Sequence, residues 1–299
     1  MELKSKRDRL QVGLLLLPGL LVFALFTIYP IGKLLHMSFL QWDLGSMLHQ
    51  KFIGLQNYID VLSDETFRIA FANTLLYTLV TVPGQMILGL LAAVLINAIP
   101  RFRVTFRVIY YIPVITSWVI VSLIFRYIFN TEGMLNYVLT NVLHLTVSNI
   151  RWLDSRWGGL TVAMMLGIWK GVGWNLVVFL AALQSVPAEL YEAADVDGAT
   201  RIQKIWYITL PSLLPTIVLM LIIRVGNIMN AGFDQIFVFY NPTVYDVADI
   251  IGTYVYRMGL GKLEFSTGTA VGLFNSVISM ILVHSSNFIA RKATGKGIW

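Results

Sequence analysis

The chain has 299 residues, of which 57% are hydrophobic and 13% charged, and it carries a formal net charge of +6. Its mean hydropathy of +0.72 excludes an ordinary soluble globular domain, which needs fewer apolar residues to fill its core. No cysteine is present and the four histidines are scattered, which excludes disulfides, a thiolate nucleophile and a clustered His/Cys metal site. In so apolar a chain, the positive charge indicates contact with the anionic face of a membrane rather than with nucleic acid.

Six stretches reach the length of about 20 mainly apolar residues that a bilayer core requires. They cover residues 11–36, 70–99, 107–129, 157–184, 211–232 and 268–290. The first is too long for the apolar region of a signal peptide and has no small-residue cleavage site, so we interpret it as a retained span. The sequence therefore predicts an all-α polytopic membrane protein with six transmembrane helices and a single domain over residues 1–299.

Lysine and arginine are distributed unevenly between the two sides of these spans. Both termini, the second-to-third loop and the central loop carry 12 of them: Lys4, Lys6, Arg7, Arg9, Arg101, Arg103, Arg107, Arg201, Lys204, Arg291, Lys292 and Lys296. The opposite segments carry 7: Lys33, Lys51, Arg68, Arg151, Arg156, Arg257 and Lys262. Because cytoplasmic loops are enriched in these residues, both termini and the central loop are predicted to be cytoplasmic.

Two of the outward segments have a composition that indicates ordered structure. The stretch Phe52–Tyr58 mixes glycine, asparagine and aromatic residues, which favours a short cap over a linker. Residues 130–157 are semi-polar and are expected to fold on the outer surface. Further on, Asn241-Pro242 marks a turn before Val247–Leu260, which is predicted to be a short amphipathic helix.

Polar side chains inside the fourth and fifth spans are candidates for a transport pathway, because such groups are costly in a bilayer and usually face a cavity or a partner. The candidates are Lys170, Trp174, Arg224, Asn227, Asn230 and Asp234. By helical spacing, Trp174 lies one turn after Lys170, and the last four share one side of the fifth span. An aromatic ring beside hydrogen-bonding amides suits a sugar. The alternative is that Arg224 pairs with Asp234 or a backbone carbonyl, and that the asparagines join helices to one another.

The central loop, residues 187–211, is a polar segment between two apolar runs. Its opening proline suits the first turn of a helix, and Glu192 lies near the positive end of that helix. Gly198 suits the left-handed residue that closes a helix, and Thr200 with Gln203 forms a capping-box pair that starts another. The pattern predicts two short helices at an angle, with acidic groups exposed, which a partner could hold.

The loop resembles the EAA loop of permease subunits of ATP-binding-cassette importers. In this family the loop binds the ATPase, which implies a coupling role for Glu192, Ala193, Ala194, Asp197, Gly198, Ile208, Leu210 and Pro211. The resemblance extends to Gly167–Lys170, Phe179–Gln184, the Gly54-x-x-Asn57-Tyr58 stretch and Gly133, Leu135 and Asn136. It is strongest to maltose-type permeases with a type I importer fold. Phe233–Phe237 through Asp246 departs from the Gly-Gly-Pro pattern common there, and is similar to the branch importing oligosaccharides or acidic fragments such as those of alginate and pectin.

The sequence has no Gly-x-x-x-x-Gly-Lys-Ser/Thr phosphate loop, so another chain must hydrolyse the ATP. The resemblance implies two partner ATPase subunits that use ATP and Mg²⁺, and no cofactor bound by this chain. It also implies a heterodimer with a second homologous permease subunit, an extracytoplasmic solute-binding protein, an oligosaccharide substrate, and a place among lipid in the bacterial cytoplasmic (inner) membrane.

Three alternatives stay open from the residues alone. A different solute of the same importer class, such as a polyol or glycerol phosphate, is compatible with the same pattern. An ion-coupled secondary transporter would need carboxylates or broken helices within spans, and only Asp234 stands out. An intramembrane enzyme would need paired aspartates, a Ser–His set or a metal-binding His motif, and none is visible, so no catalytic residue or metal ligand is assigned.

Overall fold

The computed structural model describes residues 6–42, 50–99, 101–230, 232–239, 249–295 and 297–298, with the side chains of 6–11, 156, 230 and 293 left out. These residues form helices joined by short connections and one small antiparallel strand pair. The chain divides into two compact units, Met1–Asp64 with Val255–Ser276, and Glu65–Tyr254 with Val277–Trp299.

Five helical segments within the described residues are long and apolar enough to cross a membrane: Val12–Met37, Glu65–Ala98, Trp157–Gln184, Arg201–Gly226 and Phe265–Lys292. A sixth consists of two helices, Arg103–Ile115 and Trp118–Val142, that meet at a bend of 93°. The prediction of an all-α membrane protein with six spans is thus confirmed. The third span differs from the expectation of one continuous helix over 107–129, because it is broken at residues 116–117.

The first unit holds one span and an ordered cap. Its elements are α1 (Lys6–Phe23), the π-helical turn η1 (Ala24–Ile28), α2 (Tyr29–Met37), β1 (Leu40–Gln41), β2 (Lys51–Phe52) and α3 (Gln56–Ser63). Asn57 donates to the carbonyls of Ser38 and Leu40 at 2.8 and 2.9 Å, and the Tyr58 hydroxyl bonds Ser38 at 2.9 Å. Gly54 has φ +62°, the left-handed conformation that glycine adopts readily. The predicted ordered cap at Phe52–Tyr58 is therefore confirmed.

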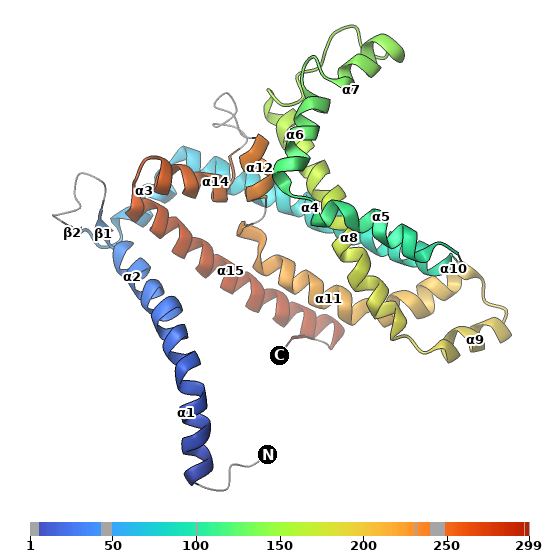
Figure 1. Cartoon of the computed structure of the whole chain (residues 1–299), viewed down its shortest axis with the longest axis horizontal. Coiled ribbons are helices and arrows are strands. Elements are labelled where there is room, and N and C mark those ends of the chain that lie inside the picture. The colour runs from blue at the N-terminus through green and yellow to red at the C-terminus, as the bar shows by residue number, and fades with distance from the viewer. Residues whose placement is uncertain are drawn as a thin grey trace. The chain divides into compact units, whose positions relative to one another are not determined.

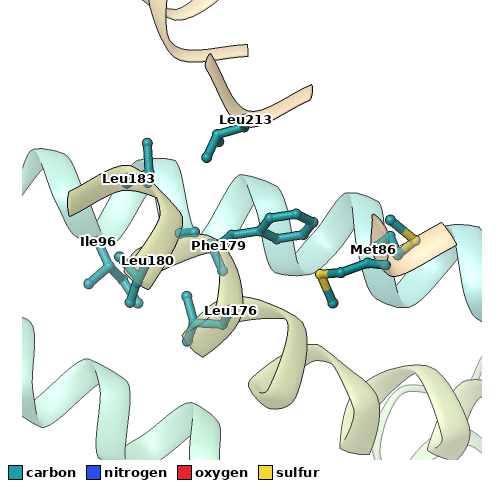
Figure 2. Close-up of a cluster of buried hydrophobic side chains, with 10 residues drawn as sticks. Met86, Ile96, Leu176, Phe179, Leu180, Leu183 and Leu213 are labelled. Carbon is teal, nitrogen blue, oxygen red and sulfur yellow. The ribbon is translucent and has the colours of Figure 1, made fainter. Parts of the chain in front are cut away.

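The second unit is built around α8 (Arg156–Gln184), which packs against α4 (Glu65–Ala98), α5 (Arg103–Ile115) and α11 (Leu210–Gly226). Figure 2 shows the buried cluster at one end of this packing, where Phe179 of α8 lies between side chains of α4 and α11. The labelled members are Met86, Ile96, Leu176, Phe179, Leu180, Leu183 and Leu213.

Small and polar residues let α4 and α8 approach closely. A Cβ on Gly171 would meet the Gln85 side chain at 2.2 Å, and Gln85 donates to the Gly167 carbonyl at 2.9 Å. Further along α4, Asn73 donates to the carbonyl of Asp249 at 2.9 Å. Close backbone approach and inter-helical hydrogen bonds replace the hydrophobic driving force that is absent in lipid. This pair of helices is the scaffold of the second unit.

The segment after α6 (Trp118–Phe129) is ordered, as its composition predicts. It contains α7 (Met134–Tyr137) and the π-helical turn η3 (Val138–Val142), and α7 lies at the opposite end of α8 from α9 (Ala188–Val196) in Figure 1. The fully buried Asn136 donates to three carbonyls, among them that of Ile150 at 2.8 Å, and accepts from the Ile150 amide and the Trp152 indole. One side chain therefore holds together a segment that has no strand or long helix.

The fifth span ends earlier than predicted, because α11 stops at Gly226. The remaining elements are the 3-10 turn η5 (Ile228–Asn230), α12 (Phe233–Phe239), α14 (Ile251–Val255), the π-helical turn η7 (Tyr256–Gly261) and α15 (Phe265–Thr294). The prediction that Arg224, Asn227, Asn230 and Asp234 share one helical face is therefore wrong. The predicted helix before the last span is found from Ile251 on, whereas Asn241–Asp246, including the Asn241-Pro242 turn, lies outside the described residues.

Candidate functional site

The central loop has the two-helix form that its sequence predicts. Pro187 is the N-cap of α9 rather than its first-turn residue, and the helix ends at Asp197 and Gly198, whose φ of +72° is left-handed. Nothing lies within 4 Å of the position that a Cβ on Gly198 would occupy, so glycine is needed for its conformation and not for space. Thr200 and Gln203 form the predicted capping box and start α10 (Arg201–Lys204).

Two side-chain contacts close this loop on itself. Tyr191 of α9 and Thr209 share a hydrogen bond of 3.0 Å, and Thr209 is the last residue of the π-helical turn η4 (Ile205–Thr209) that leads into α11. Asp195 of α9 forms an ion pair with Lys204 of α10, whose side chain is only 17% exposed. These two contacts hold α9 against the turns that lead into α11, and residues 185–187 connect α9 to α8.

The surface of the loop is apolar as well as acidic. Val196 is 89% exposed and Tyr207 is 79% exposed, and Trp206 and Ile202 are also exposed. Val196 lies outside the candidate spans, so its exposure to water is unfavourable and indicates a surface that a partner covers. Ile202, Trp206 and Tyr207 belong to Arg201–Gly226, where lipid also covers apolar side chains. The eight residues that the resemblance assigned to ATPase contact all lie on this loop. Exposed among them are Glu192, Ala193, Asp197, Gly198 and Pro211, and partly buried are Ala194, Ile208 and Leu210.

A cavity of about 530 Å³ lies between α8 and α11. Its lining consists of Trp174, Val178, Thr216, Leu219, Met220, Ile223, Arg224 and Asn227. Three of the six predicted pathway residues, Trp174, Arg224 and Asn227, thus meet in one place. The half-exposed Trp174 ring and the guanidinium of Arg224 are the largest hydrogen-bonding groups in its lining. The volume lies within the range of small-molecule sites.

The polar groups of this cavity differ in how many of their hydrogen-bonding atoms have a partner. Asn227 donates to the Ile223 carbonyl of its own helix at 3.0 Å. No ion pair joins Arg224 to Asp234, although both side chains are described, and no described residue hydrogen-bonds the guanidinium. The packing alternative in which Arg224 is neutralised by Asp234 is therefore not seen. Within the described residues, the guanidinium donors are therefore unused.

The other three predicted pathway residues lie elsewhere. The Lys170 ammonium donates to the backbone carbonyls of Pro113, Val114 and Thr116, at the bend between α5 and α6. Asp234 is exposed on α12, and the side chain of Asn230 lies outside the described residues. The structure thus places three of the predicted residues in the cavity, Lys170 at the bend and Asp234 apart from both.

Sequence reasoning missed several residues of both sites, although signals for some of them exist. Thr216 and Met220 precede Arg224 by two turns and one turn, so helical spacing alone could have placed them in the cavity. Two contacts join the parts of the loop before and after Gly198: Tyr191 with Thr209, and Asp195 with Lys204. The sequence indicates only the second of them, through the opposite charges of Asp195 and Lys204. Within the described part of the chain, no three His, Asp or Glu side chains gather as a metal site would require.

The fold and this loop define a polytopic helical membrane protein with a two-helix polar loop between its fourth and fifth spans. Residues 85–294 match the family model described as binding-protein-dependent transport system inner membrane component. The chain therefore belongs to this family.

Curated relatives and solved structures are similar over nearly the whole chain. Protein LplB of Bacillus subtilis (strain 168) is 36% identical over 98% of this chain and 92% of its own length. The polygalacturonan/rhamnogalacturonan transport system permease protein YteP of the same organism is 33% identical over 99% of this chain and 95% of its own. A crystal structure of a bacterial ABC transporter involved in the import of the acidic polysaccharide alginate matches with a TM-score of 0.86 and 33% identity, over 97% of each chain. These likenesses confirm the type I ABC importer permease fold.

Proposed function

We propose that this chain is the membrane-spanning subunit of an ATP-driven importer of oligosaccharides, including acidic fragments of polysaccharides. The observation that carries the proposal is that the α8–α11 cavity lies between the two spans that flank the central loop. A movement of the loop therefore acts on the walls of the cavity directly.

Carbohydrate as the substrate is supported by the chemistry of the cavity. Trp174 offers an aromatic face on which the apolar side of a sugar ring can stack, and Asn227 and Thr216 offer groups that bond hydroxyls. The names of the relatives point the same way, since YteP is a polygalacturonan/rhamnogalacturonan permease and the solved transporter imports alginate.

Preference for an anionic sugar rests on Arg224. Its guanidinium has no acidic partner among the described side chains, and its planar donors match a carboxylate in two parallel hydrogen bonds. A uronate carboxylate would fill this need inside the cavity, whereas a neutral sugar would leave the positive charge uncompensated.

Coupling follows from the form of the loop. Glu192–Gly198 and the helix after it sit in a groove of a cytoplasmic ATPase, which also covers the exposed Val196. When two such ATPases close around ATP, the loop moves as a rigid body and tilts its spans. The cavity, shared with a second homologous permease subunit, then changes from inward-open to outward-open. ATP and Mg²⁺ act only in the ATPases.

The same proposal sets the orientation and the outer partner. Both termini and the loop lie in the cytoplasm, as the lysine and arginine distribution favours. A solute-binding protein delivers the sugar from outside. A second solved structure supports this role, because it holds the alginate transporter in complex with an alginate pentasaccharide-bound periplasmic protein, with a TM-score of 0.86 and 32% identity over 98% of each chain.

An ion-coupled secondary transporter is the competing class, and the broken third span is the feature that such a transporter would use. Unwound carbonyls at such a break coordinate Na⁺ in transporters of that class. Here three carbonyls at the break already bind the Lys170 ammonium, which disfavours an ion site there.

Uptake measured in proteoliposomes with the complete assembly tests the coupling role. Glu192→Lys should abolish ATP-dependent uptake while the variant still inserts in the membrane. Glu132→Lys is the matched control, because it makes the same charge change on an exposed residue of the outer segment. Normal uptake by Glu192→Lys, or ATP-independent uptake by the parent chain, would contradict the proposal.

A second measurement tests the substrate class. Oligouronates and neutral oligosaccharides of equal length are compared as substrates of the parent assembly and of the Arg224→Leu variant. Loss of one charge-assisted hydrogen bond, worth about 1.5–3 kcal/mol, should reduce the preference for the uronate by about tenfold or more. Equal losses for both sugars would assign Arg224 a structural role.

A further inference from the structure

Among the predicted pathway residues whose side chains the structure describes, Lys170 is the only one with a hydrogen-bond partner for every donor. Its ammonium lies 2.6 Å from the Pro113 carbonyl oxygen, 3.0 Å from that of Val114 and 2.6 Å from that of Thr116. An ammonium has three N–H donors, so all of them are used. The same nitrogen lies 5.2 Å from the centroid of the Trp118 ring.

These acceptors are the backbone groups that a broken helix leaves without partners. Helix α5 ends at Ile115 and α6 begins at Trp118, and the two helices are bent by 93°. The last carbonyls of a helix have no partner within it, and hydrocarbon supplies no water to replace one. At the start of α6, the Val119 amide finds its partner within the same segment, because it donates to the Ser117 hydroxyl at 3.3 Å. The carbonyl side depends on a residue of another helix.

The ammonium of Lys170 lies at the carboxyl end of α5, against backbone carbonyls of the bend. The carboxyl end of α5 carries a partial negative charge, roughly half an elementary charge, that faces the ammonium. The ammonium is therefore bound to the break by charge-assisted hydrogen bonds, which are stronger than those of a neutral donor.

The helices on both sides of the break also contact α8. A Cβ on Gly173 would meet the Tyr110 carbonyl oxygen of α5 at 2.1 Å, and the Phe125 ring of α6 lies 5.5 Å from that of Trp169. Lys170 sits between these two contacts in the sequence of α8, at the level of the bend.

We propose that Lys170 is a positioning residue, a tethered cation that holds the third span in its bent form and so fixes α6, and the outer segment that follows it, to α8. Because α8 supplies the ammonium, the carbonyls at the break need no separately bound cation. This role goes beyond the proposed transport function and does not depend on which solute the protein carries.

The experiment measures the distance between α6 and α8 directly. The chain contains no cysteine, so spin labels attach only at introduced ones. Leu123→Cys on α6 and Met165→Cys on α8 replace exposed side chains, which leaves the packing intact. Pulsed electron paramagnetic resonance on the full chain in its assembly should give one narrow distance distribution. A matched pair on α4 and α8, Leu95→Cys with Val177→Cys, lies away from the bend and serves as the control.

Lys170→Met keeps the length of the side chain and removes its donors. Loss of even one charge-assisted bond should change the ratio of bent to rearranged forms by about tenfold or more, which broadens or shifts the α6–α8 distribution and leaves the control pair unchanged. Lys170→Arg should retain the narrow distribution, since it keeps the charge and the donors. An unchanged α6–α8 distribution in Lys170→Met would overturn the proposal.

Chemical rescue separates a tethered cation from a residue that merely fills space. In Lys170→Ala, propylammonium should restore the narrow distribution, and tetramethylammonium, which has charge but no N–H donor, should not. If Lys170→Met does not accumulate in membranes, the same comparison is made on the amount of Lys170→Ala that accumulates. Recovery with propylammonium alone supports the role, and recovery with neither ion or with both contradicts it.

Discussion

The hydroxyl oxygens of Tyr191 and Thr209 lie 3.0 Å apart, and their hydrogen bond joins the middle of α9 to the turn from which α11 starts. Eighteen positions separate the two residues in sequence. Because Thr209 is buried, the bond is protected from competing water and holds α9 at one angle to the fifth span. A movement of α9 is therefore expected to move α11 directly, rather than to be absorbed by a change in the conformation of the loop.

Tyr191→Phe removes only this bond, and we expect it to weaken coupling rather than assembly. A typical hydrogen bond contributes about 1 kcal/mol net, so the sugar transported per ATP hydrolysed should fall by about fivefold. Uptake and ATP hydrolysis are measured on the same reconstituted assembly. Tyr127→Phe is the control, since Tyr127 is exposed on α6 and lies outside the loop. A similar loss in both variants would show that the bond to Thr209 is not what matters.

Exchange of the charges of Asp195 and Lys204 tests whether these residues brace each other or bind the ATPase. Each single change, Asp195→Lys or Lys204→Asp, should reduce uptake because it places like charges together. If the two residues serve only each other, the double exchange restores uptake to near that of the parent. If the double variant is as poor as the single ones, at least one of the residues contacts a partner subunit.

Asn136→Ala should locally unfold the segment that follows α6. The asparagine is fully buried and bonds the backbone of Asn130, Thr131 and Ile150 as well as the Trp152 indole. Losing these bonds should lower the local stability by about 2–4 kcal/mol, since each is worth about 1 kcal/mol. The change is measured as faster proteolysis within residues 130–156 and as a shift in Trp152 fluorescence.

Asn141→Ala is the matched control for that measurement, because Asn141 is exposed in the same segment. It should leave proteolysis and fluorescence unchanged. Equal sensitivity of the two variants would mean that the segment is not organised by Asn136.

Gly173→Ala should destabilise the packing of α5 on α8. The added methyl group would meet the Tyr110 carbonyl oxygen at 2.1 Å, and a backbone atom cannot move aside as a flexible side chain can. Such overpacking costs about 1–3 kcal/mol and should lower the thermal unfolding midpoint in detergent. Gly272→Ala is the control, because nothing lies within 4 Å of that Cβ and alanine is the better helix former. A lower midpoint in both variants would refute the packing explanation.

Features that depend on neighbouring residues in the sequence were predicted well. The capping box of Thr200 and Gln203, the left-handed Gly198 and the ordered Phe52–Tyr58 cap involve residues a few positions apart, so local rules describe them. The spans were predicted for the same reason, because a bilayer selects apolar length and little else. The exceptions were the early end of α11 and the broken third span, where Pro113 and the Thr116-Ser117 pair were the overlooked signals.

The sequence by itself determined the class of protein, the number of spans and the two-helix form of the loop, since hydropathy, helix capping and turn conformation act over a few residues. Only the tertiary structure decided which polar side chains lie next to one another in the fold. It put Trp174 and Arg224 in one cavity and turned Lys170 to the α5–α6 bend, more than 50 positions away in the chain. The physical reason is that a charge in a membrane must find a partner, and helix packing decides which partner lies within reach.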